Sequence, residues 1–356
     1  MKKNMKNLKI FKNKKIIVTG HTGFKGSWLT LWLLHLGSKI MGISNSENIS
    51  SSNFKLFNLK EKIIHKKVDL RNSKKIKKLI NTFEPDFIFH LAAQAIVKES
   101  FKNPKATWET NTIGTINILE SLKKMNKSCV AVIITSDKVY RNLEIKRGYR
   151  ENDLLGGIDP YSASKASADI AIKSYAKSFF KKKKIKIGIA RAGNVIGGGD
   201  WSSGRLIPDC IKSWSKNKKV IIRNPYSTRP WQHVLDVLNG YLTLASNLKK
   251  NKLLHGEAFN FGPSGANTNV LKLVKKMRKR WNKVDFKILK NKKILESKLL
   301  KLNSMKSKKI LKWNCILNLD KSVLLTMEWY IKYFENKKEL LRLSLNQIKK
   351  FESLKK

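Results

Sequence analysis

Short runs of β-branched and apolar residues alternate with amphipathic stretches along the first half of the chain. The runs are typical of buried parallel strands, and the stretches are typical of helices. We expect strands at 14–19, 40–43, 63–68, 87–91, 130–134 and 185–190, and helices at 27–36, 74–83, 107–126 and 162–180. This alternation predicts an α/β fold with a doubly wound parallel sheet, whose ligands bind beyond the carboxyl ends of the strands.

The second half is less regular and is broken by Gly and Pro, as at Gly197-Gly-Gly199, Arg229-Pro230 and Gly262-Pro263. It predicts a smaller, mixed α/β C-terminal lobe for a substrate. The expected organisation is a basic N-terminal arm (1–13), a Rossmann-type domain (14–190), a mainly substrate-binding lobe (191–335) and a Lys-rich C-terminal helix or tail (336–356). A return of the chain to the first domain around 232–255 is left open.

Composition narrows the function classes. The formal charge is +50, but the Lys excess is spread through every segment, so it indicates a general compositional bias rather than a nucleic-acid patch. No apolar run approaches the roughly 20 residues of a membrane span, and the N-terminus lacks a signal peptide's apolar region, so we expect a cytoplasmic protein. Cys129, Cys210 and Cys315 are isolated, which predicts neither a metal site nor disulfides.

Three glycines join the first expected strand to the first expected helix. Gly20 can take a tight turn, Gly23 lets the backbone approach a pyrophosphate at the helix N-terminus, and Gly26 allows close helix–strand packing. Their spacing is three and three, unlike the G-x-G-x-x-G form. The alternative is a structural turn without a ligand, but the strand-to-helix junction favours a dinucleotide.

Tyr161 and Lys165 lie four residues apart, so on a helix they share a face and the ammonium can lower the phenol pKa. Alone, such a pair is common on solvated helices. The cluster Ser136-Asp137-Lys138 at the end of the fifth expected strand adds a hydroxyl, a carboxylate and an amine at the same sheet edge. Together these groups favour redox and acid–base chemistry.

Four arginines stand out in a chain whose basic residues are mostly lysine: Arg191, Arg205, Arg223 and Arg229. The planar guanidinium fork suits a diphosphate, which predicts a nucleotide-diphosphate substrate in the second lobe. For each one, a surface ion pair is the alternative.

The motifs also carry a family resemblance. Gly20-x-x-Gly-x-x-Gly26, Asp69-Leu-Arg71, His90-Leu-Ala-Ala-Gln94, Asn111-x-x-Gly-Thr115 and Tyr161-x-x-x-Lys165 together resemble the extended short-chain dehydrogenases/reductases. Within them, five blocks resemble the CDP-glucose 4,6-dehydratase family: His21-Thr-Gly-Phe-Lys-Gly-Ser-Trp28, Thr135-Ser-Asp-Lys138, Gly148-Tyr-Arg-Glu-Asn-Asp153, Arg191-Ala-Gly-Asn-Val-Ile-Gly-Gly-Gly-Asp-Trp201 and Arg229-Pro-Trp-Gln-His-Val234. The likeness runs from about residue 14 to 333.

This resemblance implies a lyase that uses bound NAD to oxidise C4 of CDP-glucose, eliminates water across C5 and C6, and returns the hydride to C6. Tyr161 would take the C4 hydroxyl proton, helped by Lys165, Ser136 and Asn111, and a protonated Asp137 would assist loss of the C6 hydroxyl. Lys138 stands where related dTDP-sugar dehydratases carry glutamate. Whether Lys138 or another group removes the C5 proton stays open, and the product is expected to lead to a deoxysugar of a surface polysaccharide.

The same resemblance implies the binding residues. For NAD they are Gly20, Thr22, Gly23, Phe24, Gly26, Ser44, Asp69, Leu70, Leu91, Ala92 and Ala93, with Tyr161 and Lys165. For the nucleotide sugar they are Gln94, Asn194, Arg205, Arg223 and Arg229. The chain departs from the usual NAD pattern after the second strand, where Ser44 and Asn45 occur and the first acid is Glu47, so discrimination against NADP stays open.

Two other functions are compatible with parts of the pattern. A nucleotide-sugar 4-epimerase shares Tyr161, Lys165 and the glycines but has no use for an acid such as Asp137. A non-catalytic nucleic-acid-binding relative has no reason to retain Tyr161, Lys165 and Ser136. Family resemblance also implies a homodimer or tetramer through the helices at 107–126 and 162–180, although their apolar faces are equally consistent with core packing.

Overall fold

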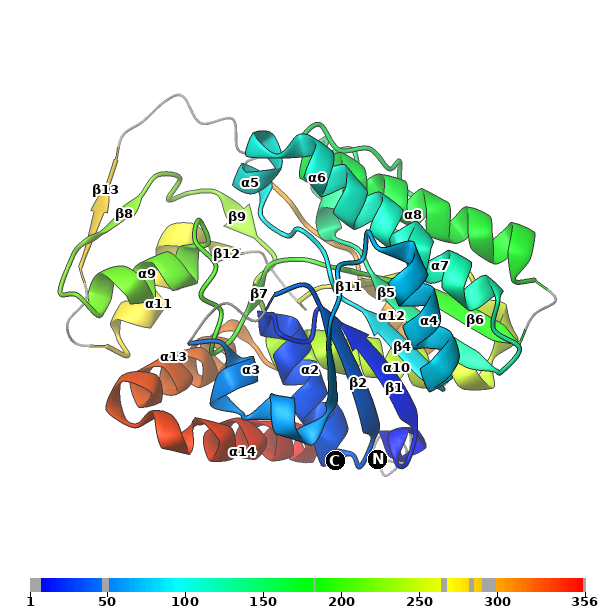
Figure 1. The fold of residues 1–356 in the computed structure, drawn as a ribbon. Coiled ribbons are helices and arrows are strands. Elements are labelled where there is room, and N and C mark those ends of the chain that lie inside the picture. Colours follow the sequence, from blue (N-terminus) through cyan, green and yellow to red (C-terminus); the bar gives the residue numbers. More distant parts are fainter. Residues whose placement is uncertain are drawn as a thin grey trace.

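A seven-stranded parallel sheet forms the centre of the computed structural model, which describes residues 8–46, 51–181, 184–263, 268–281, 285–289 and 299–354 (Figure 1). Its strands are β1 (Lys15–Thr19), β2 (Lys39–Ser44), β3 (Ile64–Lys67), β4 (Phe87–His90), β5 (Cys129–Ile134), β6 (Ile185–Ala192) and β11 (Ala258–Phe261). Their order across the sheet is β11-β6-β5-β4-β1-β2-β3, and every neighbouring pair is parallel. The predicted Rossmann-type fold is confirmed.

The six strands expected from the sequence are present, and the seventh, β11, was not anticipated. Its four residues, Ala-Phe-Asn-Phe, include a polar side chain and lie in the half of the chain that is rich in loop signals. β11 is fully buried and pairs with β6, so tertiary pairing rather than local pattern defines it.

Helices cover both faces of the sheet. On one face, α4 (Ser73–Phe83), α7 (Gly114–Lys123) and α8 (Pro160–Phe179) share an apolar core with the strands. On the other, α2 (Phe24–His35) and α10 (Val234–Lys250) form a second core. Trp28 and Trp32 of α2 are completely buried there. The sheet is thus covered on both sides, as a parallel sheet requires.

The helix expected at 107–126 is divided into three parts. It consists of α6 (Pro104–Trp108), a π-helical turn (Glu109–Ile113) and α7. Such π-helical turns occur often at functional sites, and this one contains Asn111. A short helix, α5 (Val97–Lys102), precedes α6.

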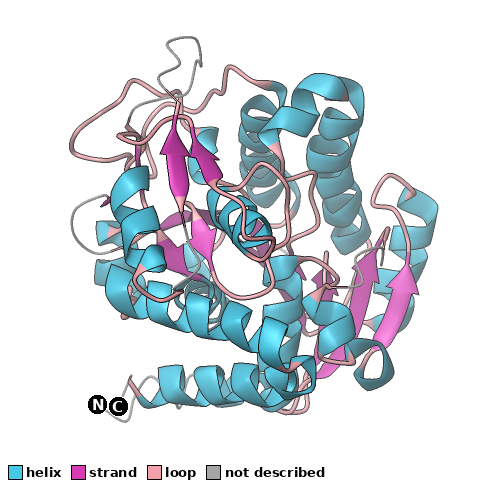
Figure 2. Cartoon of the chain, turned by 90° about the vertical axis from the view of Figure 1, so that its left-hand side faces the viewer, coloured by secondary structure: helices cyan, strands magenta, loops and turns pink. Residues whose placement is uncertain are grey.

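The second lobe is built from short elements, seen at the left of Figure 1 and face-on in Figure 2. They are β7 (Val195–Ile196), α9 (Leu206–Trp214), β8 (Val220–Ile222), β9 (Thr228–Arg229), β10 (Gln232–His233), β12 (Thr268–Asn269), α11 (Val270–Arg278) and β13 (Phe286–Ile288). Three two-stranded sheets, β10-β7, β12-β9 and β13-β8, join them. Elsewhere α3 (Asn53–Leu56) follows β2, and α12 (Met305–Leu311) packs near β11.

The last helices return to the first domain. α13 (Leu319–Glu335) is followed by α14 (Leu340–Ser353), which packs on α2. The indole nitrogen of Trp32 donates to a carboxylate oxygen of Glu352 at 2.8 Å. At the other end of the chain, the expected basic arm is described from residue 8, and Leu8 and Phe11 are buried in the core. Among the described residues, no helix is long and apolar enough to cross a membrane.

Candidate active site

Parallel strands bring residues from distant segments to one edge of the sheet. Thr19 at the end of β1 is aligned with His90 at the end of β4, and His90 is aligned with Ile133 of β5. The glycine turn, the Leu91–Ala93 segment and Ser136 follow these strand ends directly. The predicted convergence of the candidate residues at the carboxyl edge is therefore what the fold produces.

The three glycines of the turn differ in what surrounds them. Gly20 has φ +72°, and a Cβ there would lie 2.8 Å from the backbone nitrogen of Ala92. At Gly26 a Cβ would lie 2.0 Å from the Gly20 carbonyl oxygen, so helix and turn pack too closely for any side chain. Around Gly23, the N-cap of α2, the nearest atom to a Cβ is 3.4 Å away. Gly23 thus leaves the helix N-terminus approachable, the geometry a pyrophosphate requires.

Next to the glycine turn, this edge is lined by hydroxyl groups. The Thr22 and Ser44 side-chain oxygens are 2.7 Å apart, and Thr22 Oγ1 also donates to the Ser46 carbonyl at 2.8 Å. Ser44 is the last residue of β2, which extends one residue beyond the strand expected at 40–43. Glu47, the first acid after β2, lies outside the described residues.

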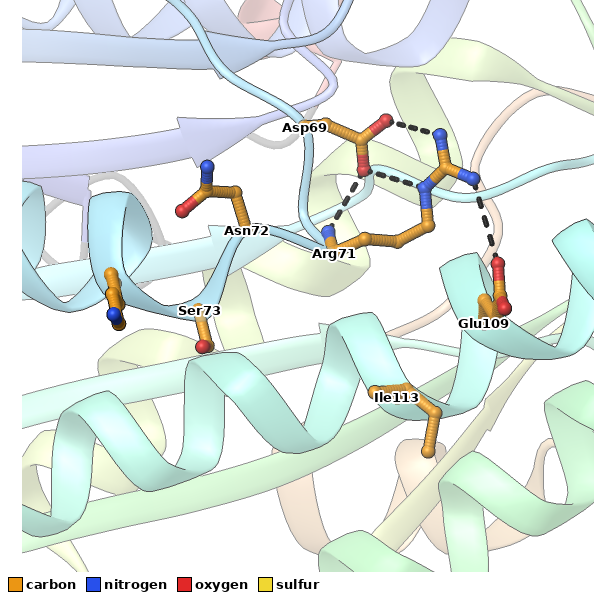
Figure 3. Close-up of a pocket in the computed structure, with 7 residues that line it drawn as sticks. Asp69, Arg71, Asn72, Ser73, Glu109 and Ile113 are labelled. Carbon is orange, nitrogen blue, oxygen red and sulfur yellow. Dashed lines mark hydrogen bonds and ion pairs between the residues drawn. The ribbon is translucent and has the colours of Figure 1, made fainter.

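At the same edge, a cavity of about 760 Å³ opens beside Asp69 (Figure 3). The Arg71 guanidinium binds both Asp69 carboxylate oxygens, with Nε–Oδ1 3.0 Å and Nη2–Oδ2 2.9 Å, and approaches Glu109 at 3.5 Å on its far side. These hydrogen bonds lower the pKa of Asp69. The cavity is lined by Asp69, Arg71, Asn72, Ser73, Lys74, Glu109 and Ile113. It has room for a flat aromatic base.

The other expected cofactor residues close the sheet edge between these two regions. The amide nitrogen of Ala92 donates to Thr19 Oγ1 at 3.1 Å, which fixes the segment that contains Leu91 and Ala93. Leu70 is buried, and its carbonyl accepts a hydrogen bond from Asn117 at 2.8 Å. Phe24, the first residue of α2, faces Gly197 of the second lobe.

After β5, Asp137 and Lys138 begin a 3-10 turn (Asp137–Val139), and Ser136 is its N-cap. Ser136 Oγ donates to Asp137 Oδ1 at 3.0 Å and accepts from the Lys138 amide at 3.2 Å. Asp137 is 4% exposed, and its Oδ2 has no hydrogen-bond partner among the described residues. Burial raises the pKa of Asp137, with the charges of Lys138 and Arg229 acting in the opposite direction. A carboxyl group in this setting retains its proton more readily than an exposed one.

Tyr161 and Lys165 lie in the first turns of α8, which begins after the N-cap Asp159. Burial, with a smaller contribution from the nearby charge of Lys25, lowers the pKa of Lys165 to about 7. Its Nζ donates to the Ile134 carbonyl at 3.1 Å. Burial raises the pKa of Tyr161, whereas a Ser136 hydrogen bond and the Arg205 charge act against this. The lowering expected from Lys165 is not found in the protein alone, because Lys165 is itself only partly charged near neutral pH.

Asn111 is hydrogen-bonded both to Gln94 and to Ser164 of α8. Asn111 is buried, and its Nδ2 donates to the Gln94 carbonyl and to Ser164 Oγ, each at 3.0 Å. Asn111 therefore contacts the neighbour of Lys165 in the chain. The Gln94 side chain binds Thr107 Oγ1 at 3.0 Å and the Ile96 amide at 2.5 Å, so its amide group is used within the protein.

The arginines of the second half fall into different environments. Arg229 of β9 is 8% exposed, and its charge acts on Asp137. Arg205 precedes α9 and binds Asp200 at 2.9 Å. Arg223 follows β8 and is exposed, while Asn194 lies between β6 and β7. Arg191 is completely buried and paired with Asp169, so the interpretation of Arg191 as a diphosphate ligand is wrong.

Two residues near this cluster were missed in the sequence. Lys25 lies in the first turn of α2, and its Nζ is 5.9 Å from the ring centroid of Tyr241 on α10. The Tyr241 hydroxyl is buried without a hydrogen-bond partner among the described residues. Burial and the Arg205 charge lower the pKa of Lys25, Asp137 and Asp200 oppose this, and the net result is a pKa of about 8. Only the convergence of α2 and α10 shows that Lys25 belongs to the site.

Replacing Lys25 by methionine should stabilise the protein near pH 7 by on the order of 2 kcal/mol, allowing for the partial exposure of the side chain. The Lys25 amine binds its proton less tightly in the folded protein than in the unfolded chain. The destabilisation by its buried charge is therefore complete below pH 8 and disappears as the pH rises toward 10.5. Denaturant titrations at several pH values measure it. Lys105→Met, at a side chain 90% exposed, is the control. A stabilisation independent of pH would contradict the buried charge.

Comparisons with known proteins agree with the geometry. Residues 17–324 match the family described as GDP-mannose 4,6 dehydratase. The chain is 43% identical over 277 residues to a CDP-glucose 4,6-dehydratase of Salmonella typhimurium, covering 76% of this chain and 77% of that protein. It is 28% identical over 284 residues to a CDP-paratose 2-epimerase of Salmonella typhi, covering 73% and 82%. The solved epimerase Mth375 of Methanothermobacter thermautotrophicus shares the fold, with TM-score 0.82, 22% identity and coverage of 94% and 97%.

Proposed function

Since the chain belongs to the GDP-mannose 4,6 dehydratase family, we propose that it converts CDP-glucose to CDP-4-keto-6-deoxyglucose and water. The observation that carries this proposal is the buried Asp137 carboxyl in a turn shared with Ser136 and Lys138, beside Tyr161. An oxidation needs only the tyrosine, the lysine and the serine. An elimination requires, in addition, an acid that protonates the departing C6 hydroxyl. Identity of 43% to a CDP-glucose 4,6-dehydratase supports the choice of nucleotide.

The residues at the sheet edge fit NAD. Gly23 would admit the pyrophosphate at the start of α2, Thr22 and Ser44 would meet the adenine ribose, and the cavity at Asp69 would take the adenine. Leu70, Leu91, Ala92 and Ala93 would complete the site, with Phe24 at the start of α2. When bound, NAD would accept the hydride from C4 and return it to C6.

Oxidation at C4 depends on where the hydroxyl proton goes. Tyr161, as the phenolate that a charged Lys165 would favour, would accept it, and Ser136 would hydrogen-bond the same oxygen after turning its hydroxyl away from Asp137. Because the pKa of Lys165 is near 7, its charged and neutral forms differ little in free energy at neutral pH. It would stabilise the phenolate once the substrate excludes water, while Asn111 holds the adjacent Ser164 in place.

The elimination step would use Asp137 and a base at C5. Oxidation to the 4-ketone acidifies the C5 proton, so a modest base can remove it. Asp137 would donate its proton to the C6 hydroxyl as this leaves as water, a role that its raised pKa favours. Lys138 is the amine nearest along the chain to Asp137 and is our candidate for the base at C5, with removal by another group as the alternative. The rates of elimination in Lys138→Met and Lys138→Arg distinguish Lys138 from another group as the base at C5.

The nucleotide diphosphate would lie against the second lobe. Arg229 and Arg205 would bind the phosphate oxygens through their planar forks, with Asn194 between β6 and β7 and Arg223 at the exposed end of β8. Arg229 and Asp137 are electrostatically coupled, so the diphosphate and the reacting sugar would share one pocket wall. The side-chain amide of Gln94 is bonded within the protein, so Gln94 would contact the substrate through its backbone.

We propose also that the protein is a homo-oligomer, formed through the helices next to Tyr161. Large apolar side chains are exposed on the short helices before the π-helical turn and on α8: Phe101 on α5, Trp108 on α6, and Ile170 and Phe179 on α8. Together they form a surface that a second copy could cover by two-fold symmetry. Light scattering after size exclusion gives the mass directly.

The experiment for the reaction is to incubate the protein with NAD and CDP-glucose and to follow the sugar nucleotide by mass spectrometry. Loss of the mass of one water supports the dehydratase. A changed retention time at unchanged mass identifies an epimerase instead. UDP-, dTDP- and GDP-glucose in parallel reactions test the choice of cytosine, and no change in any of them excludes the enzymatic function.

A further inference from the structure

A buried ion pair connects three segments that surround the proposed site. Asp169 on α8 and Arg191 on β6 are both completely buried. The guanidinium binds both carboxylate oxygens, with Nη2–Oδ1 2.7 Å and Nε–Oδ2 2.8 Å. Asp169 lies one helical turn after Lys165 and two turns after Tyr161, so the pair is attached to the face of α8 that carries them.

The pair is bonded to both ends of the turn that contains Ser136, Asp137 and Lys138. At the near end, Thr135 Oγ1 donates to Asp169 Oδ2 at 3.2 Å. At the far end, Arg191 Nη1 donates to the Tyr140 hydroxyl at 2.8 Å, which donates in turn to Asn260 Oδ1 at 2.7 Å. The four residues 136–139 therefore lie between two residues, Thr135 and Tyr140, that are both bonded to this ion pair.

The same network fixes the loop that leads to Tyr161. The ring of Tyr149 stacks on that of Tyr140, with centroids 5.0 Å apart. Arg191 Nη1 also donates to the Glu151 carbonyl at 3.0 Å. Asn260 of β11 donates from its side-chain Nδ2 to the Tyr149 carbonyl and from its backbone nitrogen to Glu151 Oε1, each at 2.8 Å. The blocks at 148–153 and 191–201 are thus joined in space.

The energetics do not favour a role in stability alone. Burying two charges removes them from water, and well-packed apolar residues of similar volume often stabilise a fold as well or better. A hydrogen-bonded pair gives a definite geometry instead, because each bond limits where its partner can lie. Since Asp169 and Arg191 reach no ligand surface, their effect on chemistry must act through the residues they hold.

We propose that Asp169 and Arg191 are positioning residues for the turn 136–140, with Tyr140 as the anchor that aims Asp137 and Lys138. The proposal rests on the proposed function. Tyr161 and Lys165 have attachments of their own, at the Asp159 cap and the Ile134 carbonyl. Loosening the Tyr140 anchor should therefore disturb elimination more than oxidation.

Tyr140→Phe tests this directly, since it removes the hydroxyl and keeps the ring that stacks on Tyr149. In rapid-quench single turnovers, elimination should slow by about 10- to 100-fold while C4 oxidation changes by less than about threefold. The 4-keto sugar that still carries its C6 hydroxyl should then accumulate, together with the absorbance of the reduced nicotinamide. Thr135→Val loosens the end next to Ser136 and should slow both steps.

The matched control is Tyr175→Phe, which removes another hydroxyl from α8, one that donates to Glu120 of α7 at 2.8 Å. It should leave both steps unchanged. Equal slowing of both steps by Tyr140→Phe, or behaviour like that of the control, would overturn the positioning role.

A second readout does not depend on catalysis. Amide hydrogen exchange within 136–140 should be faster in Tyr140→Phe than in Tyr175→Phe, at matched thermal stability. If the wild-type protein fails to release water from CDP-glucose, the proposed function fails, and this exchange measurement decides the positioning role by itself. Unchanged exchange would then reject it.

Discussion

Replacing Tyr161 by phenylalanine should lower the rate of C4 oxidation by about 10²- to 10⁴-fold, the range that a positioned acid–base group contributes. Tyr161 is the phenol at the start of α8. Lys165, which would stabilise the Tyr161 phenolate, lies one helical turn later. The ring of phenylalanine fills the same volume, so folding should be unaffected. Single-turnover absorbance of the reduced nicotinamide measures the step.

Tyr226→Phe serves as the control for this substitution, because the Tyr226 side chain is 76% exposed and lies in the second lobe. Its rate should match that of the wild-type protein. Oxidation that persists in Tyr161→Phe at more than about a tenth of the normal rate would show that another base takes the C4 proton.

Asp137→Asn should separate the two halves of the reaction. Oxidation should continue near its normal rate, and elimination should fall by about 10²- to 10⁴-fold, because asparagine cannot donate the proton that the C6 hydroxyl needs. The oxidised sugar should accumulate and be detected after quenching. Since burial already disfavours the charged carboxylate, the neutral asparagine should not destabilise the fold at neutral pH.

The pH dependence gives an independent check on Asp137. Its pKa is raised, so the protonated form extends to higher pH than for an ordinary carboxyl group, and elimination should decline as pH rises through that value. The decline should be absent in Asp137→Asn, whose residual rate has no such carboxyl group. Normal elimination in this variant would assign the acid to another group.

The sheet and its edge could be predicted because each buried strand is a local apolar run, and parallel strands bring their carboxyl ends together. That topology alone predicts that Gly20, Asp69, Ala92 and Ser136 lie at one edge of the sheet. β11 could not be predicted, since its burial comes from pairing with β6 rather than from its own four residues.

Side-chain partners were beyond the sequence for a related reason. Arg191 has the same local pattern as an arginine that binds phosphate, and only the fold places Asp169 against it. Lys25 follows Phe24 in a glycine turn, where nothing local indicates that α10 and Arg205 will enclose it. Burial then lowered the pKa of Lys165 enough to remove much of the charge expected to act on Tyr161.

The most direct test of the central claim follows the hydrogen at C4. CDP-glucose that carries deuterium at C4 should give a product with deuterium at C6, accompanied by loss of ordinary water, because the same hydride leaves and returns. Mass spectrometry and proton NMR of the product locate the label. Deuterium retained at C4, or lost to the solvent with no label at C6, would contradict a 4,6-dehydratase.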